Sequence, residues 1–136
     1  MYSINLVGVF VAAIVAFILG FLFHGPLLGK LWMRLANITP TGNEKFSDMY
    51  GQMIWNFVMN MITAYGLAVL YSFTSGTMSG AKAVSGMICG FLGWVFIMTS
   101  SAMHVIWMGK SYKLWLFEAL ASLVVMLSMG AIVAVW

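Results

Sequence analysis

Four long stretches of apolar residues, separated by short polar segments, dominate the chain. They cover residues 4–23, 53–73, 83–106 and 114–135. A helix of about 20 residues is long enough to cross the hydrocarbon core of a bilayer, which is about 30 Å thick. Because lipid offers no partner to backbone N–H and C=O groups, spans of this kind are helical. The pattern therefore predicts an all-α membrane protein, with four transmembrane helices forming a single domain over residues 1–136.

The composition supports a membrane protein. Of the 136 residues, 63% are hydrophobic and 7% are charged, whereas about 25% are charged in a typical soluble domain. Mean hydropathy is +1.03. The net charge is +3, and all six basic residues lie between the spans. We therefore expect the lipid bilayer to be the main partner, and we do not expect the chain to bind nucleic acid.

The basic residues predict how the spans are oriented. Five of them lie between spans one and two or between spans three and four: Lys30, Arg34, Lys45, Lys110 and Lys113. Only Lys82 lies in the loop on the opposite side. Because Lys and Arg in short loops stay in the cytoplasm, we expect a multi-pass protein of the cell membrane, the inner membrane in a bacterium. Loops 24–52 and 107–113 would be cytoplasmic, and both termini would lie outside.

A short amphipathic segment follows the first span. Gly25 precedes a proline, so the first helix should end near this point. Over residues 26–35, helical spacing places leucines and Trp32 on one arc, and Lys30 and Arg34 on the other. This pattern predicts a cytoplasmic interfacial helix, with Trp32 at the level of the lipid headgroups and the two cations facing phosphates.

Several segments resemble a bacterial family of four-span membrane proteins catalogued as domain of unknown function 1761. They are "GPLLGKLWMRL", "NMITAYGLAVLYS", "CGFLGWVFIMTSS" and "KLWLFEALASLVVMLSMGAIVAV", which together extend over nearly the whole chain. The most specific of them is the Pro26 to Met33 run. The resemblance implies a four-span fold and leaves the activity unassigned. Where the family has an aromatic Trp-Tyr-Ser before the proline, this chain has Phe23-His24-Gly25, so the resemblance implies no role for His24.

The chain contains a short internal repetition. His24 followed by Gly29-Lys30 recurs, with an offset of 80 residues, as His104 followed by Gly109-Lys110. Since spans one and three run in the same direction, this favours a parallel two-plus-two pseudo-repeat. Chance similarity between the ends of two apolar helices is the alternative.

Small residues recur along two of the spans. The first span carries Gly8, Ala12, Ala16 and Gly20, and the third carries Gly86, Gly90 and Gly93. Rows of this kind let two helix backbones approach closely in a membrane. We therefore predict tight helix packing along both rows, with one of them joining copies of the chain in a homo-oligomer. A ligand cleft on these faces is the alternative.

Polar residues form a stripe along the second span. They are Gln52, Asn56, Asn60 and Thr63. Polar groups are costly against lipid, so the stripe should face the interior, either bonding to other helices or lining a solute or ion path. Glu118 is the only carboxylate within a span; we expect an interfacial ion pair with Lys113 or Lys110, and proton coupling is the alternative.

The two histidines invite a further interpretation. At equal depth on parallel helices, His24 and His104 could together bind haem or a metal. No nucleotide-binding, metalloprotease, hydrolase or dithiol motif occurs in the sequence. We therefore expect a non-catalytic structural, interaction or ligand-binding four-helix bundle without a cofactor. The alternative is a small transporter or channel subunit that uses the stripe and Glu118, and a haem or metal protein comes third.

Overall fold

The computed structural model describes residues 3–136 and is built from helices. The helices are α1 (Leu6–His24), α2 (Gly29–Leu35), η1 (Phe46–Met49), α3 (Tyr50–Thr74), α4 (Lys82–Met108) and α5 (Tyr112–Val135). Four of them, α1, η1 with α3, α4 and α5, are long and apolar enough to cross a membrane. The predicted all-α fold with four spans is confirmed.

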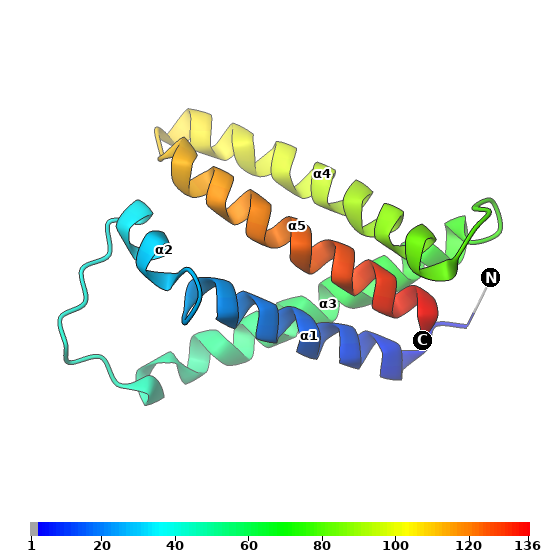
Figure 1. The fold of residues 1–136 in the computed structure, drawn as a ribbon, viewed down its shortest axis with the longest axis horizontal. Helices are drawn as coiled ribbons and strands as arrows, with labels where there is room; N and C mark the ends of the chain where they lie inside the picture. The colour runs from blue at the N-terminus through cyan, green and yellow to red at the C-terminus, as the bar shows by residue number, and fades with distance from the viewer. Residues whose placement is uncertain (1–2) are drawn as a thin grey trace.

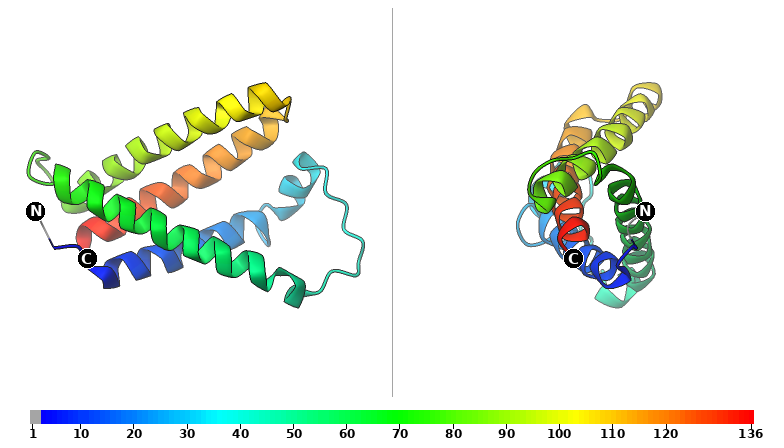
Figure 2. Two further views of the ribbon diagram at one scale, coloured as in Figure 1. Left: turned by 180° about the vertical axis from the view of Figure 1, so that it is seen from behind. Right: turned by 90° about the vertical axis from the view of Figure 1, so that its right-hand side faces the viewer.

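The central helix is α5, which contacts α1, α3 and α4. Figures 1 and 2 show that the helices come together at the end where both termini lie. At the opposite end they splay apart, with α4 and α5 on one side and α3 on the other, while α2 continues beyond the end of α1 and bends toward the start of α5.

Helices α4 and α5 pack with their backbones in contact. A Cβ atom added at Gly86 would overlap the carbonyl oxygen of Gly130, and one added at Gly90 would overlap that of Met126. The glycine row of α4 therefore lies against α5 of the same chain. Trp94 ties the same pair of helices together, because its indole N–H donates to the Ala119 carbonyl at 2.8 Å and to the Ser122 hydroxyl at 3.1 Å.

The core between α1, α3 and α5 consists of small and flexible apolar residues. Its buried members are Val9, Ala12, Ala16, Ala64, Leu67, Ala68, Met126 and Met129. Alanines let the three backbones approach closely, while the methionines fill the remaining gaps. Gly20 continues the α1 row, but a Cβ built there would meet nothing within 4 Å. The row therefore packs tightly at one end of α1 and faces open space at the other.

The outer surface of the bundle is apolar. Phe96, Ile106 and Trp107 are 74%, 76% and 88% exposed, and at most 28% of the residues in any of the four spans are buried. Large apolar side chains in such numbers on a water-facing surface would cause aggregation, whereas lipid accommodates them. The surface thus fits a membrane protein.

The connections within the two halves of the chain differ. Helices α4 and α5 are joined by a short turn at Gly109, which has a φ of 61°. Helices α1 and α3 are joined by α2 and a long loop (Figure 1). The loop carries Glu44, whose carboxylate accepts the backbone N–H and the hydroxyl of Thr41, and these bonds hold the pKa of that carboxyl below its usual value. The two-plus-two pseudo-repeat stays a prediction.

Candidate functional site

A cavity of about 470 Å³ lies at the splayed end, between α1, α3 and α5 and beneath α2. Its wall is mostly apolar and includes Phe17, Phe21, Phe23, Phe46, Met53 and Val125. Its polar lining consists of His24, Trp32, Gln52, Asn56, Asn60, Glu118 and Ser122. Sites for small molecules typically have this size and this combination of an apolar wall with a few polar groups.

The turn between α1 and α2 determines where Trp32 lies. Residues 25–28 form turns, so α2 begins at Gly29 instead of at residue 26 as we predicted. The backbone folds so tightly that a Cβ at Gly25 would lie 2.7 Å from the Phe21 oxygen, and one at Gly29 would lie 2.9 Å from the His24 oxygen. The Gly-Pro-Leu-Leu-Gly segment thus bends the chain, so that α2 leaves the end of α1 toward the start of α5 (Figure 1).

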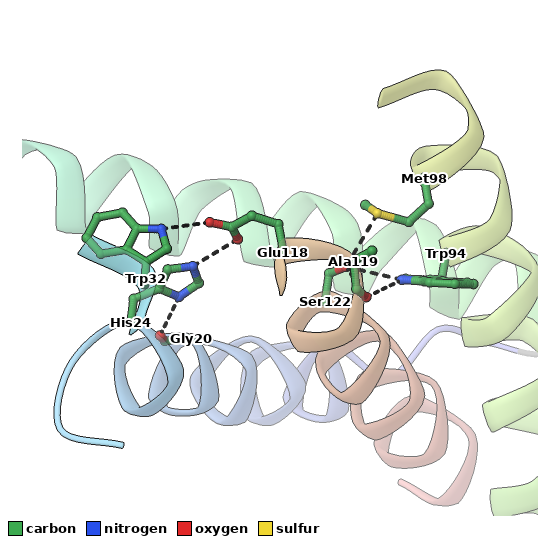
Figure 3. Close-up of polar contacts among 8 residues, drawn as sticks. All are labelled: Gly20, His24, Trp32, Trp94, Met98, Glu118, Ala119 and Ser122. Atoms are coloured by element: carbon green, nitrogen blue, oxygen red, sulfur yellow. Dashed lines mark hydrogen bonds and ion pairs between the residues drawn. The ribbon is translucent and has the colours of Figure 1, made fainter. Parts of the chain in front are cut away.

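Because α2 bends toward α5, Trp32 points toward Glu118 (Figure 3). Its indole N–H donates to Glu118 Oε1 at 2.8 Å (Figure 3). The Trp32 side chain therefore meets protein, whereas its position at the level of the lipid headgroups stays a prediction. Lys30 and Arg34, on the other arc, are exposed as expected.

Glu118 also binds His24. The distance from His24 Nε2 to Glu118 Oε2 is 2.9 Å. The sequence suggested Lys113 or Lys110 as the partner of Glu118, and this prediction was wrong, since no lysine nitrogen lies within 4 Å of the carboxylate in the described part of the chain. The pair borders the cavity: the His24 side chain is 33% exposed and that of Glu118 is 41% exposed.

The His24 ring is held from several directions. Its Nδ1 lies 2.9 Å from the Gly20 carbonyl oxygen, one helical turn earlier. The rings of Trp32 and Phe117 pack nearly perpendicular to it, with ring centroids 5.3 and 5.8 Å away. We call His24, Trp32 and Glu118 the His–Glu–Trp cluster. It joins α1, α2 and α5 at one point.

The hydrogen bonds of His24 determine how many protons the pair holds. A carbonyl oxygen can only accept, so Nδ1 must donate to Gly20. The bond between Nε2 and Oε2 then contains one further proton, which belongs either to an imidazolium facing a carboxylate or to a neutral carboxyl facing a neutral imidazole. Both arrangements have zero net charge. Glu118 and His24 together therefore hold one exchangeable proton in this geometry.

The polar stripe of α3 reaches the same cavity. Gln52, Asn56 and Asn60 line it opposite the His–Glu–Trp cluster. Asn60 Nδ2 donates to Asn56 Oδ1 at 3.3 Å, and the Thr63 hydroxyl donates to the Met59 carbonyl at 2.9 Å. Both bonds lie within α3, so in the described residues the stripe does not form the bonds between helices that we predicted. Thr63 lies beyond the cavity lining.

The two histidines lie apart. Within residues 3–136, α1 and α4 make no contact, because α5 lies between them (Figure 1). His104 is exposed and lines a second cavity of about 800 Å³, which also contains Lys110 and Ser111. The structure therefore does not bring His24 and His104 together as a pair of ligands. Glu118 borders both cavities.

A family model described as "Protein of unknown function (DUF1761)" matches residues 7–134. The resemblance noted in the sequence is thereby confirmed. No curated protein and no solved structure matches the chain.

Proposed function

This chain belongs to the DUF1761 family of proteins of unknown function, and we propose that it binds an amphipathic small molecule in the cavity beneath α2. The observation that carries the proposal is the convergence of polar groups from four helices on one apolar cavity. His24 comes from α1, Trp32 from α2, Asn56 from α3 and Glu118 from α5.

The two ends of the cavity differ in chemistry. Toward the core, Ala16, Phe17, Ala121 and Val125 form an apolar wall, which would accommodate an acyl chain or ring system. Near the His–Glu–Trp cluster it offers a carboxylate, an imidazole and amide groups. An amphipathic molecule satisfies both ends at once: its apolar part fills space between helices, and its polar end pairs with groups that would otherwise face hydrocarbon.

Binding fits the structure better than transport through the bundle. A path to the opposite membrane face would have to pass the buried side chains of Leu67, Met126 and Met129. These residues are packed in the core shared by α1, α3 and α5. A binding site requires only access from the splayed end, whereas transport would require this core to open.

The proposal can be tested by filling the cavity. Gly20→Leu would place a side chain into open space within it, because no atom lies within 4 Å of the added Cβ. The matched control is Gly66→Leu, on an exposed face of α3 where the added Cβ also meets nothing. Each purified protein would be incubated with monolaurin, a neutral single-chain amphiphile, and examined by native mass spectrometry.

We expect the parent and the Gly66→Leu variant to retain monolaurin and the Gly20→Leu variant to lose it. Circular dichroism spectra and thermal unfolding would show that all three proteins are folded. Equal retention by the three proteins would place the amphiphile elsewhere on the surface, and the absence of retention by the folded parent would equally contradict the proposal.

A further inference from the structure

We infer that the ligand is a lipophilic monovalent cation whose charged part lies beside Glu118, and that its binding releases the proton held between His24 and Glu118. The inference rests on the proposed function, since it names the class of molecule that the cavity would take. The ligand and the proton would then compete for the same site.

The charges around the cavity select the sign of the ligand. Among the described residues that line it, none is a lysine or arginine, and Glu118 is the one carboxylate. A phosphate or carboxylate headgroup would find no fixed positive charge except His24, which already faces Glu118 at 2.9 Å. An anion buried without a partner is strongly disfavoured, so the cavity favours a neutral or cationic head.

The aromatic wall favours a cation further. Phe17, Phe21, Phe23, Trp32 and Phe46 all line the cavity. Aromatic faces attract cations through the ring quadrupole, most strongly where water is excluded, and organic ammonium ions are recognised in this way. A carboxylate at the end of an aromatic wall supplies both the counter-charge and the surface that a lipophilic cation needs.

Proton exchange follows from the geometry of the pair. A cation beside Glu118 is stabilised by the carboxylate form of that side chain. If the shared proton stayed, the site with its bound cation would have a net charge of +1, whereas the free pair has a net charge of zero. Release of one proton leaves a neutral His24, a Glu118 carboxylate and the cation, so the net charge returns to zero. No covalent bond changes apart from loss of the shared proton to water.

Glu118 can meet the cation without losing its other bond. Oε1 accepts the Trp32 indole N–H, whereas Oε2 is the atom paired with His24. Without the proton, Nε2 and Oε2 would both be acceptors at 2.9 Å, an unfavourable arrangement that a cation beside Oε2 relieves. Trp32 therefore positions the carboxylate while the second oxygen exchanges a proton for a ligand.

Other charged groups near Glu118 are few. From α4 and the following turn, His104 and Lys110 face it across the second cavity. From α3 and η1 the cavity lining contributes Gln52, Asn56, Asn60, Phe46 and Met49, which do not titrate. Helix α2 contributes Trp32, since Lys30 and Arg34 lie outside the lining. In the described residues the exchange thus involves the His24–Glu118 pair, and Lys110 is the lysine that lines the second cavity together with Glu118.

The test uses a cation and its isosteric anion. Binding of tetraphenylphosphonium to the full chain in maltoside micelles would be measured by isothermal titration calorimetry at pH 6, 7 and 8, with tetraphenylborate as the anionic control. Because one proton is released per cation bound, linkage predicts that affinity rises about tenfold for each pH unit while the free pair holds its proton. Repeating the titration in buffers of different ionisation enthalpy would count the released protons.

Two glutamate variants complete the experiment. Glu118→Gln keeps an acceptor for Trp32 but no charge, so it should bind tetraphenylphosphonium at least tenfold more weakly and still retain monolaurin. Glu44→Gln, in an exposed loop outside the cavity, should behave like the parent. Two results would make the inference wrong while the proposed function stands, provided that the parent retains monolaurin. In the first, the parent binds tetraphenylphosphonium and tetraphenylborate equally well. In the second, it binds the cation without releasing a proton. Loss of monolaurin binding in the parent would contradict both, and the pH series on the parent tests the exchange even if Glu118→Gln does not fold.

Discussion

Replacing Gly90 by alanine tests whether the contact between α4 and α5 is as close as the structure shows. The added Cβ would overlap the Met126 carbonyl oxygen, and it would lie 2.9 Å from the Met126 carbonyl carbon and 3.4 Å from the Leu127 Cα. All three are backbone atoms of α5, so no side-chain rotation relieves the overlap. The two helices must move apart.

The cost can be estimated from packing. Restoring ordinary contact distances requires a separation of about 1 Å, which weakens dispersion contacts along the whole crossing. Overpacking in a well-packed interior typically costs about 1–3 kcal/mol, and in lipid such packing is a principal force that holds helices together. We therefore expect Gly90→Ala to destabilise the protein by about 2 kcal/mol.

Two other glycines serve as controls for Gly90→Ala. In Gly93→Ala the nearest atoms are the Met126 Cε at 3.1 Å and the Leu67 Cδ2 at 3.4 Å, which are ends of flexible side chains and can move. Gly66→Ala meets open space and should be neutral or slightly stabilising, because alanine is the better helix former. Stability would be measured by reversible unfolding in mixed maltoside and dodecyl sulfate micelles, followed by circular dichroism. If Gly90→Ala proved as stable as Gly66→Ala, the close backbone crossing would be refuted.

Three further predictions follow from particular contacts. Trp32→Phe removes the bond to the Glu118 carboxylate, and a helix of seven residues is not stable alone. Amide hydrogen exchange of α2 should therefore be faster in the variant than in the parent, while that of α5 stays unchanged. Equal exchange rates of α2 in the two proteins would contradict this. Trp94→Phe removes a doubly accepted indole N–H and should lower the free energy of unfolding by about 1 kcal/mol; an unchanged denaturation midpoint would show that these bonds contribute little. A cysteine placed at Thr77 should be labelled from outside intact cells, and one at Asn43 only after permeabilisation; the reverse pattern would invert the proposed orientation.

The spans and their approximate ends could be predicted from the sequence, because the hydrocarbon thickness imposes a length and a composition on every crossing segment. The bend that brings α2 against α5 could not be predicted in this way. Helical spacing shows that Trp32 lies on the apolar arc, but lipid and protein both accept an apolar arc. What decides between them is the tight Gly25–Gly29 turn, whose close backbone contacts appear only in three dimensions.

The partner of Glu118 illustrates a bias toward neighbours in the sequence. Lys113 and Lys110 lie five and eight positions before it, whereas His24 lies 94 positions away. One signal for the correct partner was present: α1 ends at His24 on the side where α5 begins, so both side chains lie at the same end of the bundle. A shared end of the bundle thus makes residues far apart in the sequence candidates as polar partners, alongside those nearby in the chain.

The splayed end also explains why the stripe of α3 does not bond to other helices. Asn56 and Asn60 bond to each other, which leaves amide groups that can still donate and accept on the cavity side. Gly20 has no side chain and would leave room for α3 to pack against α1. In the structure, however, the two helices stay apart at this point, and the cavity lies between them. In a membrane, amide groups facing an open cavity are stable only if water or a ligand pairs with them. The separation of the helices and the polarity of the stripe are therefore one feature, and they fit a cavity that receives the polar end of a bound molecule.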